Sequence, residues 1–89
     1  MTARRFAVRG RVQGVGFRFF VSERAAFEGL AGWVRNTDDG GVEAEVEGDR
    51  EAVDRFERLV RQGPAGARVD GVDVTDVTPE GRRGFSITR

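Results

Sequence analysis

Two glycines and an arginine at close spacing form the first candidate for chemistry in this sequence. An alternating apolar segment ends at Val12, glycines stand at 14 and 16, and Arg18 falls near the expected start of a helix. Glycines let successive backbone N–H groups turn toward one point, and a helix N-terminus adds partial positive charge. An arginine can hold a phosphate through two parallel hydrogen bonds. The order of residues suits an anion cradle, but a lone G-x-G is more often an ordinary tight β–α turn followed by a surface arginine.

A second polar segment lies before the expected hairpin turn at residues 38–41. Asn36 stands at the end of an expected strand. Its amide offers both a donor and an acceptor, so it can hold a water molecule without acting as a base. Asparagine beside a turn can also satisfy the turn backbone. The adjacent Arg35 could be a second phosphate ligand, but neighbouring strand residues point to opposite faces, so we assign Arg35 to surface charge pairing.

The residue types that are missing limit the chemistry further. The sequence has no histidine, cysteine, lysine or tyrosine, so the commonest general base and the thiol and amine nucleophiles are absent. Without histidine or cysteine, no zinc site of the usual ligand types is expected. Ser22 and Ser86 have no basic partner in the sequence and are poor candidates for a nucleophile. An enzyme with this composition would work by positioning and electrostatics, and we expect neither a metal nor a cofactor.

Length and charge describe a small domain without a global basic field. The 89 residues are enough for one domain, which we expect to span residues 1–89. The formal net charge is zero, so nothing calls for nucleic acid or a membrane as partner. The charge is uneven, with net +5 over residues 1–36 and net −5 over residues 37–89. No long apolar run indicates a signal peptide or membrane span, and the lack of cysteine suits a cytoplasmic protein.

Hydrophobic periodicity predicts an α+β protein of the order βαββαβ with a short extra C-terminal strand. This order is typical of the ferredoxin-like sandwich, in which two helices cover one face of an antiparallel sheet. The usual order of its main strands is fourth, first, third, second. The strands are expected near residues 5–12, 33–37, 42–47, 68–77 and 85–87, and the helices near residues 17–29 and 50–61.

Local patterns add details that a structure can test. A break in alternation near Gly71 predicts a bulge, and Gly29 and Gly32 are expected to mark the end of the first helix. The glutamates of the third strand are expected on a solvated face, paired with Arg9 and Arg11. Phe17 and Trp33 are expected to serve packing. The expected core faces are Phe19, Phe20, Ala26, Phe27 and Leu30 for the first helix and Val53, Phe56, Leu59 and Val60 for the second.

The two polar segments together resemble the acylphosphatase family. Residues 10–18 read GRVQGVGFR, which fits the family pattern G-x-V-Q-G-V-G-F-R. Residues 32–43 read GWVRNTDDGGVE, which fits G-W-V-R-N-x-x-D-G-x-V-E. The resemblance continues through Gly63-Pro64 to the closing Phe85-Ser86-Ile87 and spans almost the whole chain. Two long motifs in the expected order are far more specific than a lone G-x-G.

The resemblance implies a function and a set of site residues. Arg18 would bind the phosphoryl group of an acyl phosphate, and Asn36 would orient the water that attacks phosphorus. The products would be a carboxylate and inorganic phosphate, with phosphate also an inhibitor. The family uses no metal and no phosphoenzyme. The backbone N–H groups that would help to bind phosphate belong to Gly14, Val15, Gly16, Phe17 and Arg18.

The sequence departs from the family at the edge of the implied pocket. Family members often carry a tyrosine soon after the motif arginine and another near the C-terminus. This chain has Phe19-Phe20 and Phe85-Ser86-Ile87 in those regions. The implied catalytic pair is untouched, but packing and substrate preference at the pocket edge are left open.

Two other readings compete with a monomeric enzyme. The carbamoyltransferases of hydrogenase maturation carry an acylphosphatase-like domain, so this chain could be a module that binds carbamoyl phosphate or another acyl phosphate without turnover. An RNA-recognition domain shares the βαββαβ order but needs exposed aromatic residues on its central strands, where this sequence has arginine, alanine and glutamate. Among substrates, acetyl phosphate, carbamoyl phosphate and acylated sugar phosphates all remain open.

Overall fold

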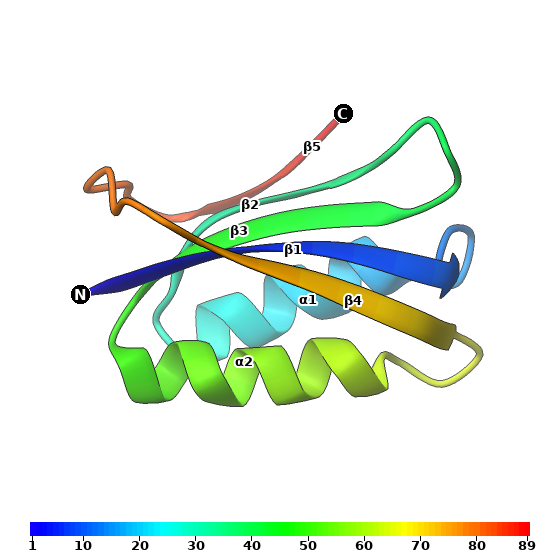
Figure 1. The fold of residues 1–89 in the computed structure, drawn as a ribbon, viewed down its shortest axis with the longest axis horizontal. Coiled ribbons are helices and arrows are strands. Elements are labelled where there is room, and N and C mark those ends of the chain that lie inside the picture. Colours follow the sequence, from blue (N-terminus) through cyan, green and yellow to red (C-terminus); the bar gives the residue numbers. More distant parts are fainter.

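The computed structural model describes residues 1–89 and has the predicted βαββαβ order, with a fifth strand at the C-terminus. Both helices cover one face of the sheet, and the other face is open (Figure 1). Neither helix is long and apolar enough to cross a membrane. The elements are β1 (Thr2–Arg11), α1 (Phe17–Phe27), β2 (Ala31–Asn36), β3 (Val42–Gly48), α2 (Arg50–Gln62), β4 (Arg68–Val77) and β5 (Phe85–Thr88).

The strand order is β4-β1-β3-β2-β5, which confirms the predicted order of the four main strands. These four pair antiparallel, whereas β5 pairs with β2 in parallel, so the whole sheet is mixed. The predicted bulge is also confirmed. Arg9 lies opposite Gly71 while Gly10 lies opposite Val69, so Asp70 is an extra residue in β4.

One apolar core fills the space between the sheet and the helices. Fifteen buried side chains form it, with alternate residues of β1 and β3 on one side and the apolar stripe of α2 on the other. The rings of Phe6 in β1 and Phe56 in α2 lie 5.5 Å apart at its centre. Full burial of each such side chain stabilises the fold by about 1.5–3 kcal/mol relative to exposure.

The predicted core face of α1 is wrong for Phe19, Ala26 and Phe27, whereas Leu30 is buried in the core and Phe20 packs against it. Phe19 and Phe27 are 63% and 80% exposed, whereas Phe17, Val21 and Ala25 are buried. The buried residues are four apart, so they form one stripe that begins at the first residue of the helix. Their decreasing size lets the helix pack closely on the sheet. The bulkier aromatic side chains are a misleading guide to the buried face, because the first turn of the helix sets which residues face the sheet. Ala26 is also exposed, and Phe20 is half-buried. Leu30 is buried but lies beyond the end of the helix.

The end of α1 agrees with the prediction for Gly29 and differs from it for Gly32. The helix ends at Phe27, and Gly29 follows its cap with a φ of +70°, as expected of a helix-ending glycine. Gly32 instead lies inside β2. A Cβ atom there would fall only 1.8 Å from the carbonyl oxygen of Glu45, so this glycine permits close pairing of β2 with β3.

The charge pairs on the open face also differ from the prediction. Arg5, not Arg9, pairs with a β3 glutamate, and its guanidinium lies 2.8 Å from Glu45. Arg9 pairs with Asp73 of β4 at 3.4 Å, and Arg11 makes no ion pair. The register explains the shift, because Arg5 lies directly opposite Glu45, while Arg9 is beyond the last pair between β1 and β3.

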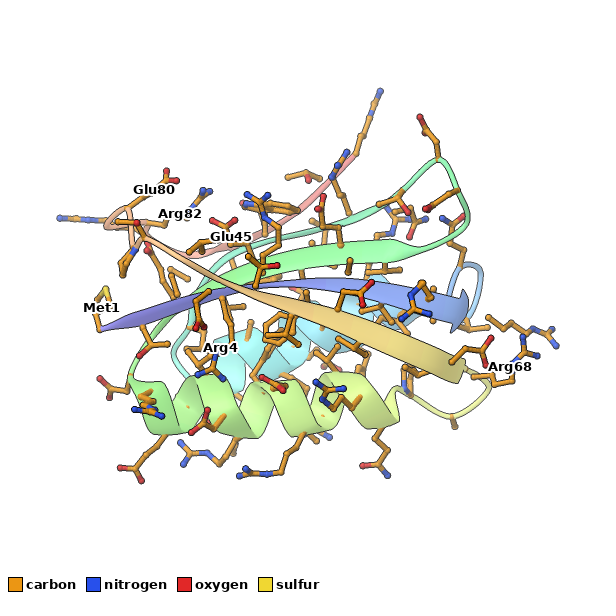
Figure 2. All side chains as sticks on the ribbon, viewed as in Figure 1. Met1, Arg4, Glu45, Arg68, Glu80 and Arg82 are labelled. Atoms are coloured by element: carbon orange, nitrogen blue, oxygen red, sulfur yellow. The ribbon has the colours of Figure 1, made fainter.

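The glutamates of β3 are not on a fully solvated face. Glu45 and Glu47 are only 3% and 4% exposed, and residues 80–82, in the segment between β4 and β5, contact both of them. Figure 2 shows Arg82 and Glu80 on the same side of the sheet as Glu45. Arg82 of that segment lies 3.0 Å from Glu45. Glu47 accepts the backbone N–H of Glu80 at 2.6 Å and the N–H of Arg82. Two buried carboxylates therefore clamp the connection that leads into β5.

Candidate active site

The loop between β1 and α1 has the shape that the sequence predicts for an anion cradle. Gly14 and Gly16 have φ values of +74° and +77°, in the left-handed region that favours glycine. The apolar residues of the loop anchor it, because Val12 and Phe17 are buried and Val15 packs against the core. The backbone is therefore held in a conformation that an alanine at either glycine would strain.

The N–H groups of this loop are free to bind an anion. None of Gly14, Val15 and Gly16 donates a backbone hydrogen bond within the protein. The first bond of the helix runs from the N–H of Phe20 to the carbonyl oxygen of Gly16, at 3.0 Å. The N–H groups of the first turn of α1 are therefore also open, and the helix dipole adds partial positive charge there.

Arg18 differs from every other arginine in the chain. Four arginines are partly buried, and Arg4, Arg35 and Arg82 each pair with carboxylates. Arg18 is the only partly buried arginine without an ion pair or a side-chain hydrogen bond. A partly buried guanidinium without a partner in the protein is available to an anion from outside the protein.

Asn36 ends β2 on the same face as the buried Val34, which is the face that the helices cover. Arg35 points the other way, as predicted, and lies 2.7 Å from Glu43 with its guanidinium 5.9 Å from the ring of Trp33. The side chain of Asn36 makes no hydrogen bond within the protein. Its amide is therefore available to a water molecule or a ligand.

The turn after Asn36 does not need the asparagine. The N–H of Gly41 donates to the side-chain oxygens of Thr37 and Asp39 at 3.1 and 3.2 Å, and the Thr37 hydroxyl donates to Asp39. Bonds from Thr37 and Gly41 hold the pKa of the Asp39 carboxyl below its usual value. Gly40 supplies the positive φ of +90° that the Asp-Gly turn predicts. The turn is complete without a hydrogen bond from the Asn36 side chain.

Arg18 and Asn36 line one hollow of about 250 Å³. The cradle loop and the hairpin that carries Asn36 lie at the same end of the sheet (Figure 1). The hollow contains one cation and no carboxylate, which suits an anionic ligand. Val15 turns its side chain into the core and does not line it. The lining residues are Val12, Gly14, Gly16, Phe17, Arg18, Phe19, Asn36 and Ile87.

Comparison with known proteins agrees with this arrangement. The family model described as Acylphosphatase matches residues 4–87. The chain belongs to the acylphosphatase family. The acylphosphatase of Nocardioides sp. is 51% identical over 80 residues, which cover 90% of this chain and 81% of that relative. The acylphosphatase of Methanothrix thermoacetophila is 43% identical over 83 residues, 93% and 92% of the two chains.

Solved structures carry the same conclusion. The crystal structure of the Bacillus subtilis acylphosphatase superposes with a TM-score of 0.97 over 100% of both chains, at 44% identity. Full-length HypF, solved in its phosphate- and nucleotide-bound form, gives a TM-score of 0.93 at 34% identity. The match covers 99% of this chain but 12% of HypF. Membership of the acylphosphatase family makes this chain an enzyme and implies an acyl phosphate as its substrate.

Gln13 connects two parts of the candidate site, a contact that the sequence did not reveal. Its side-chain amide donates to the carbonyl oxygens of Thr37 and Gly41, both at 2.8 Å. These bonds join the cradle loop to the hairpin that follows Asn36. The motif contains Gln13, but a glutamine has no residue-type signal for a partner more than twenty positions away.

Phe19 and Ile87 were also missed as lining residues. Phe19 was assigned to the core, and Ile87 reaches the hollow only because β5 pairs with β2 in parallel, opposite Val34. Phe17 is buried as predicted and also lines the hollow. Chain topology, rather than a local pattern, brings β5 to the site.

A larger hollow of about 720 Å³ lies on the open face of the sheet, around Trp33. Its arginines include Arg5 and Arg35, which are already neutralised by Glu45 and Glu43. Arg82 is paired with glutamates as well, and the remaining arginine, Arg83, is unpaired but exposed to solvent, whereas Arg18 is both unpaired and partly buried. The smaller hollow is therefore the better candidate for phosphate chemistry.

Proposed function

We propose that this protein hydrolyses the carboxyl–phosphate bond of acyl phosphates. Arg18 and the backbone N–H groups of residues 14–18 hold the phosphoryl group, and Asn36 orients the attacking water. One observation carries this proposal. Arg18, which is partly buried, and Asn36 both lack a side-chain partner and line the same hollow, beside backbone N–H groups that donate no hydrogen bond within the protein.

The proposed step is an in-line displacement at phosphorus. The water oxygen forms a bond to phosphorus as the bond between phosphorus and the carboxyl oxygen breaks. The bonding electron pair leaves with the carboxylate, and both water protons stay with the product as dihydrogen phosphate. No residue is modified and no co-reactant other than water is consumed.

This step suits the residue types in the hollow. A carboxylate is a good leaving group and needs no protonation by an acid, so in-line geometry and charge complementarity are sufficient. Arg18 and the open N–H groups complement the charge on the phosphoryl oxygens as the bond breaks. Asn36 can accept a hydrogen bond from the water and hold its lone pair toward phosphorus. An alkyl phosphate ester, whose leaving group needs a proton, is expected to be a poor substrate.

We propose one domain over residues 1–89 that acts as a cytoplasmic monomer without metal or cofactor, with inorganic phosphate as product and inhibitor. The single core supports the domain assignment. The open faces of the central strands β1 and β3 carry arginine, alanine and glutamate and no aromatic residue on which a base could stack, which argues against an RNA-recognition domain.

A module that binds an acyl phosphate without turnover is the second candidate, and the match to one part of HypF favours it. Phosphate release from benzoyl phosphate and acetyl phosphate by purified protein separates the two functions. We expect turnover above the spontaneous rate, unchanged by EDTA, and little release from glycerol phosphate. Binding of acyl phosphates with no turnover would favour the module, and turnover that EDTA abolishes would exclude the mechanism above.

A further inference from the structure

Two of the large apolar side chains that are exposed in this protein meet at the mouth of the active-site hollow. Phe19 is 63% exposed and Ile87 is 46% exposed, and both line the hollow that contains Arg18 and Asn36. Single exposed apolar residues are common on proteins, but a pair that converges on a hollow with a few polar groups is typical of a ligand site.

The two side chains come from distant parts of the chain. Phe19 follows Arg18 in the first turn of α1, whereas Ile87 lies in β5 opposite Val34. Asn36 is two residues beyond Val34 on the same strand. The phosphate-binding groups and the proposed water-orienting group are therefore flanked by one aromatic and one aliphatic side chain, neither of which is used by the core.

We propose that Phe19 and Ile87 contact the acyl group of the substrate and make the enzyme prefer acyl phosphates with a bulky apolar acyl group. The inference rests on the proposed function. The cradle and Arg18 hold the phosphoryl group inside the hollow, so the acyl group extends toward the mouth, where these two side chains are exposed. A benzoyl group covers much of their apolar surface, an acetyl group adds one methyl, and the carbamoyl group presents a polar amine that gains nothing there.

The preference is a ratio of specificity constants. One well-placed apolar contact changes kcat/KM by roughly 10-fold or more. We expect kcat/KM for benzoyl phosphate to exceed that for acetyl phosphate by at least about 10-fold. The acyl group is bound in both the ground state and the transition state, so the difference is expected mainly in KM.

The test uses Phe19→Ser, Ile87→Thr and the double variant, with Phe27→Ser as the matched control. Phe27 lies on the same helix, is 80% exposed and does not line the hollow. We expect the benzoyl-to-acetyl ratio of kcat/KM to fall by about 10-fold in the double variant and to stay unchanged in Phe27→Ser. The inhibition constant of inorganic phosphate should stay within about twofold in all variants, because the cradle is intact, and thermal melting checks that each variant is folded.

Three results would overturn the inference. They are a wild-type ratio near one, a ratio that the double variant keeps, and an equal fall in the Phe27→Ser control. Failure of the proposed function looks different, because the wild-type protein would then release phosphate from neither substrate. That result would remove the inference together with the function on which it rests.

Discussion

The side-chain amide of Gln13 donates a 2.8 Å hydrogen bond to the carbonyl oxygen of Thr37, the residue that follows Asn36. A second bond of 2.8 Å runs from the same amide to Gly41. Gln13 immediately precedes the cradle glycines, so one side chain joins the phosphate-binding loop to the hairpin that carries the proposed water-orienting residue. We expect the spacing between the two halves of the candidate site to depend on this contact.

Replacement of Gln13 by alanine is expected to loosen that spacing. Two carbonyl groups lose their donor, which costs about 1–3 kcal/mol of stability. Misplacement of Asn36 relative to the cradle should lower kcat by roughly 10- to 100-fold, while phosphate still binds to the intact loop. Melting temperature, kcat and the inhibition constant of phosphate measure the three effects. Gln62→Ala, at the exposed end of α2, is the control, and normal kcat in folded Gln13→Ala would argue against a positioning role.

Replacement of Arg18 by lysine keeps one positive charge but removes the planar pair of donors. Loss of a charge-assisted hydrogen bond of about 1.5–3 kcal/mol should weaken phosphate binding by roughly 10- to 100-fold, with a parallel rise in KM. Folding should be unaffected because Arg18 has no partner in the protein. Arg24→Lys, on the same helix and without an ion pair, is the control. Near-normal phosphate affinity in Arg18→Lys would remove the cradle assignment.

Because of the Glu47 carboxylate, we expect the folded protein to lose stability in acid. Burial raises the pKa of its carboxyl, but the backbone N–H groups of Arg82, Glu80 and Gly81 outweigh burial and lower the pKa overall. A lowered folded-state pKa means that the carboxylate stabilises the fold fully above the unfolded value, near pH 4.3, and that this stabilisation is lost as pH falls through the folded value. Above that range the contribution is constant.

Thermal melting of Glu47→Gln between pH 7 and pH 2.5 tests this. The variant should melt below the wild type at pH 7, and the two curves should converge as pH falls below about 4.3. Glu23→Gln, exposed on α1 without an ion pair, should follow the wild type throughout. A gap between Glu47→Gln and the wild type that stays constant to pH 2.5 would contradict the proposed clamp on the segment before β5.

Regular local patterns predicted most of the fold. Alternation placed the strands, the break near Gly71 placed the bulge, and the stripe around Val53 and Phe56 placed α2. The face of α1 was wrong because Phe19 and Phe27 are larger and more apolar than the Val21 and Ala25 that the core takes. When apolar residues occur on several faces of a helix, their size alone cannot show which face is buried.

The site was predictable in part for the same reason. Arg18 and Asn36 lie in local motifs, and Arg35 could be separated from Asn36 by strand alternation alone. Gln13 and Ile87 could not be found, because their roles depend on contacts across the chain. The buried state of Glu45 and Glu47 was hidden too, since only the path of a later segment removes them from water.

The most direct test of the central claim is kcat of Asn36→Ala on an acyl phosphate, measured with its melting temperature on the same preparation. The variant keeps the cradle and Arg18 and loses only the group proposed to orient water. We predict that kcat falls by roughly two to three orders of magnitude while KM, phosphate inhibition and melting temperature change little. A variant that melts at a lower temperature but turns over normally in its folded fraction would contradict the account and leave Asn36 with a structural role only.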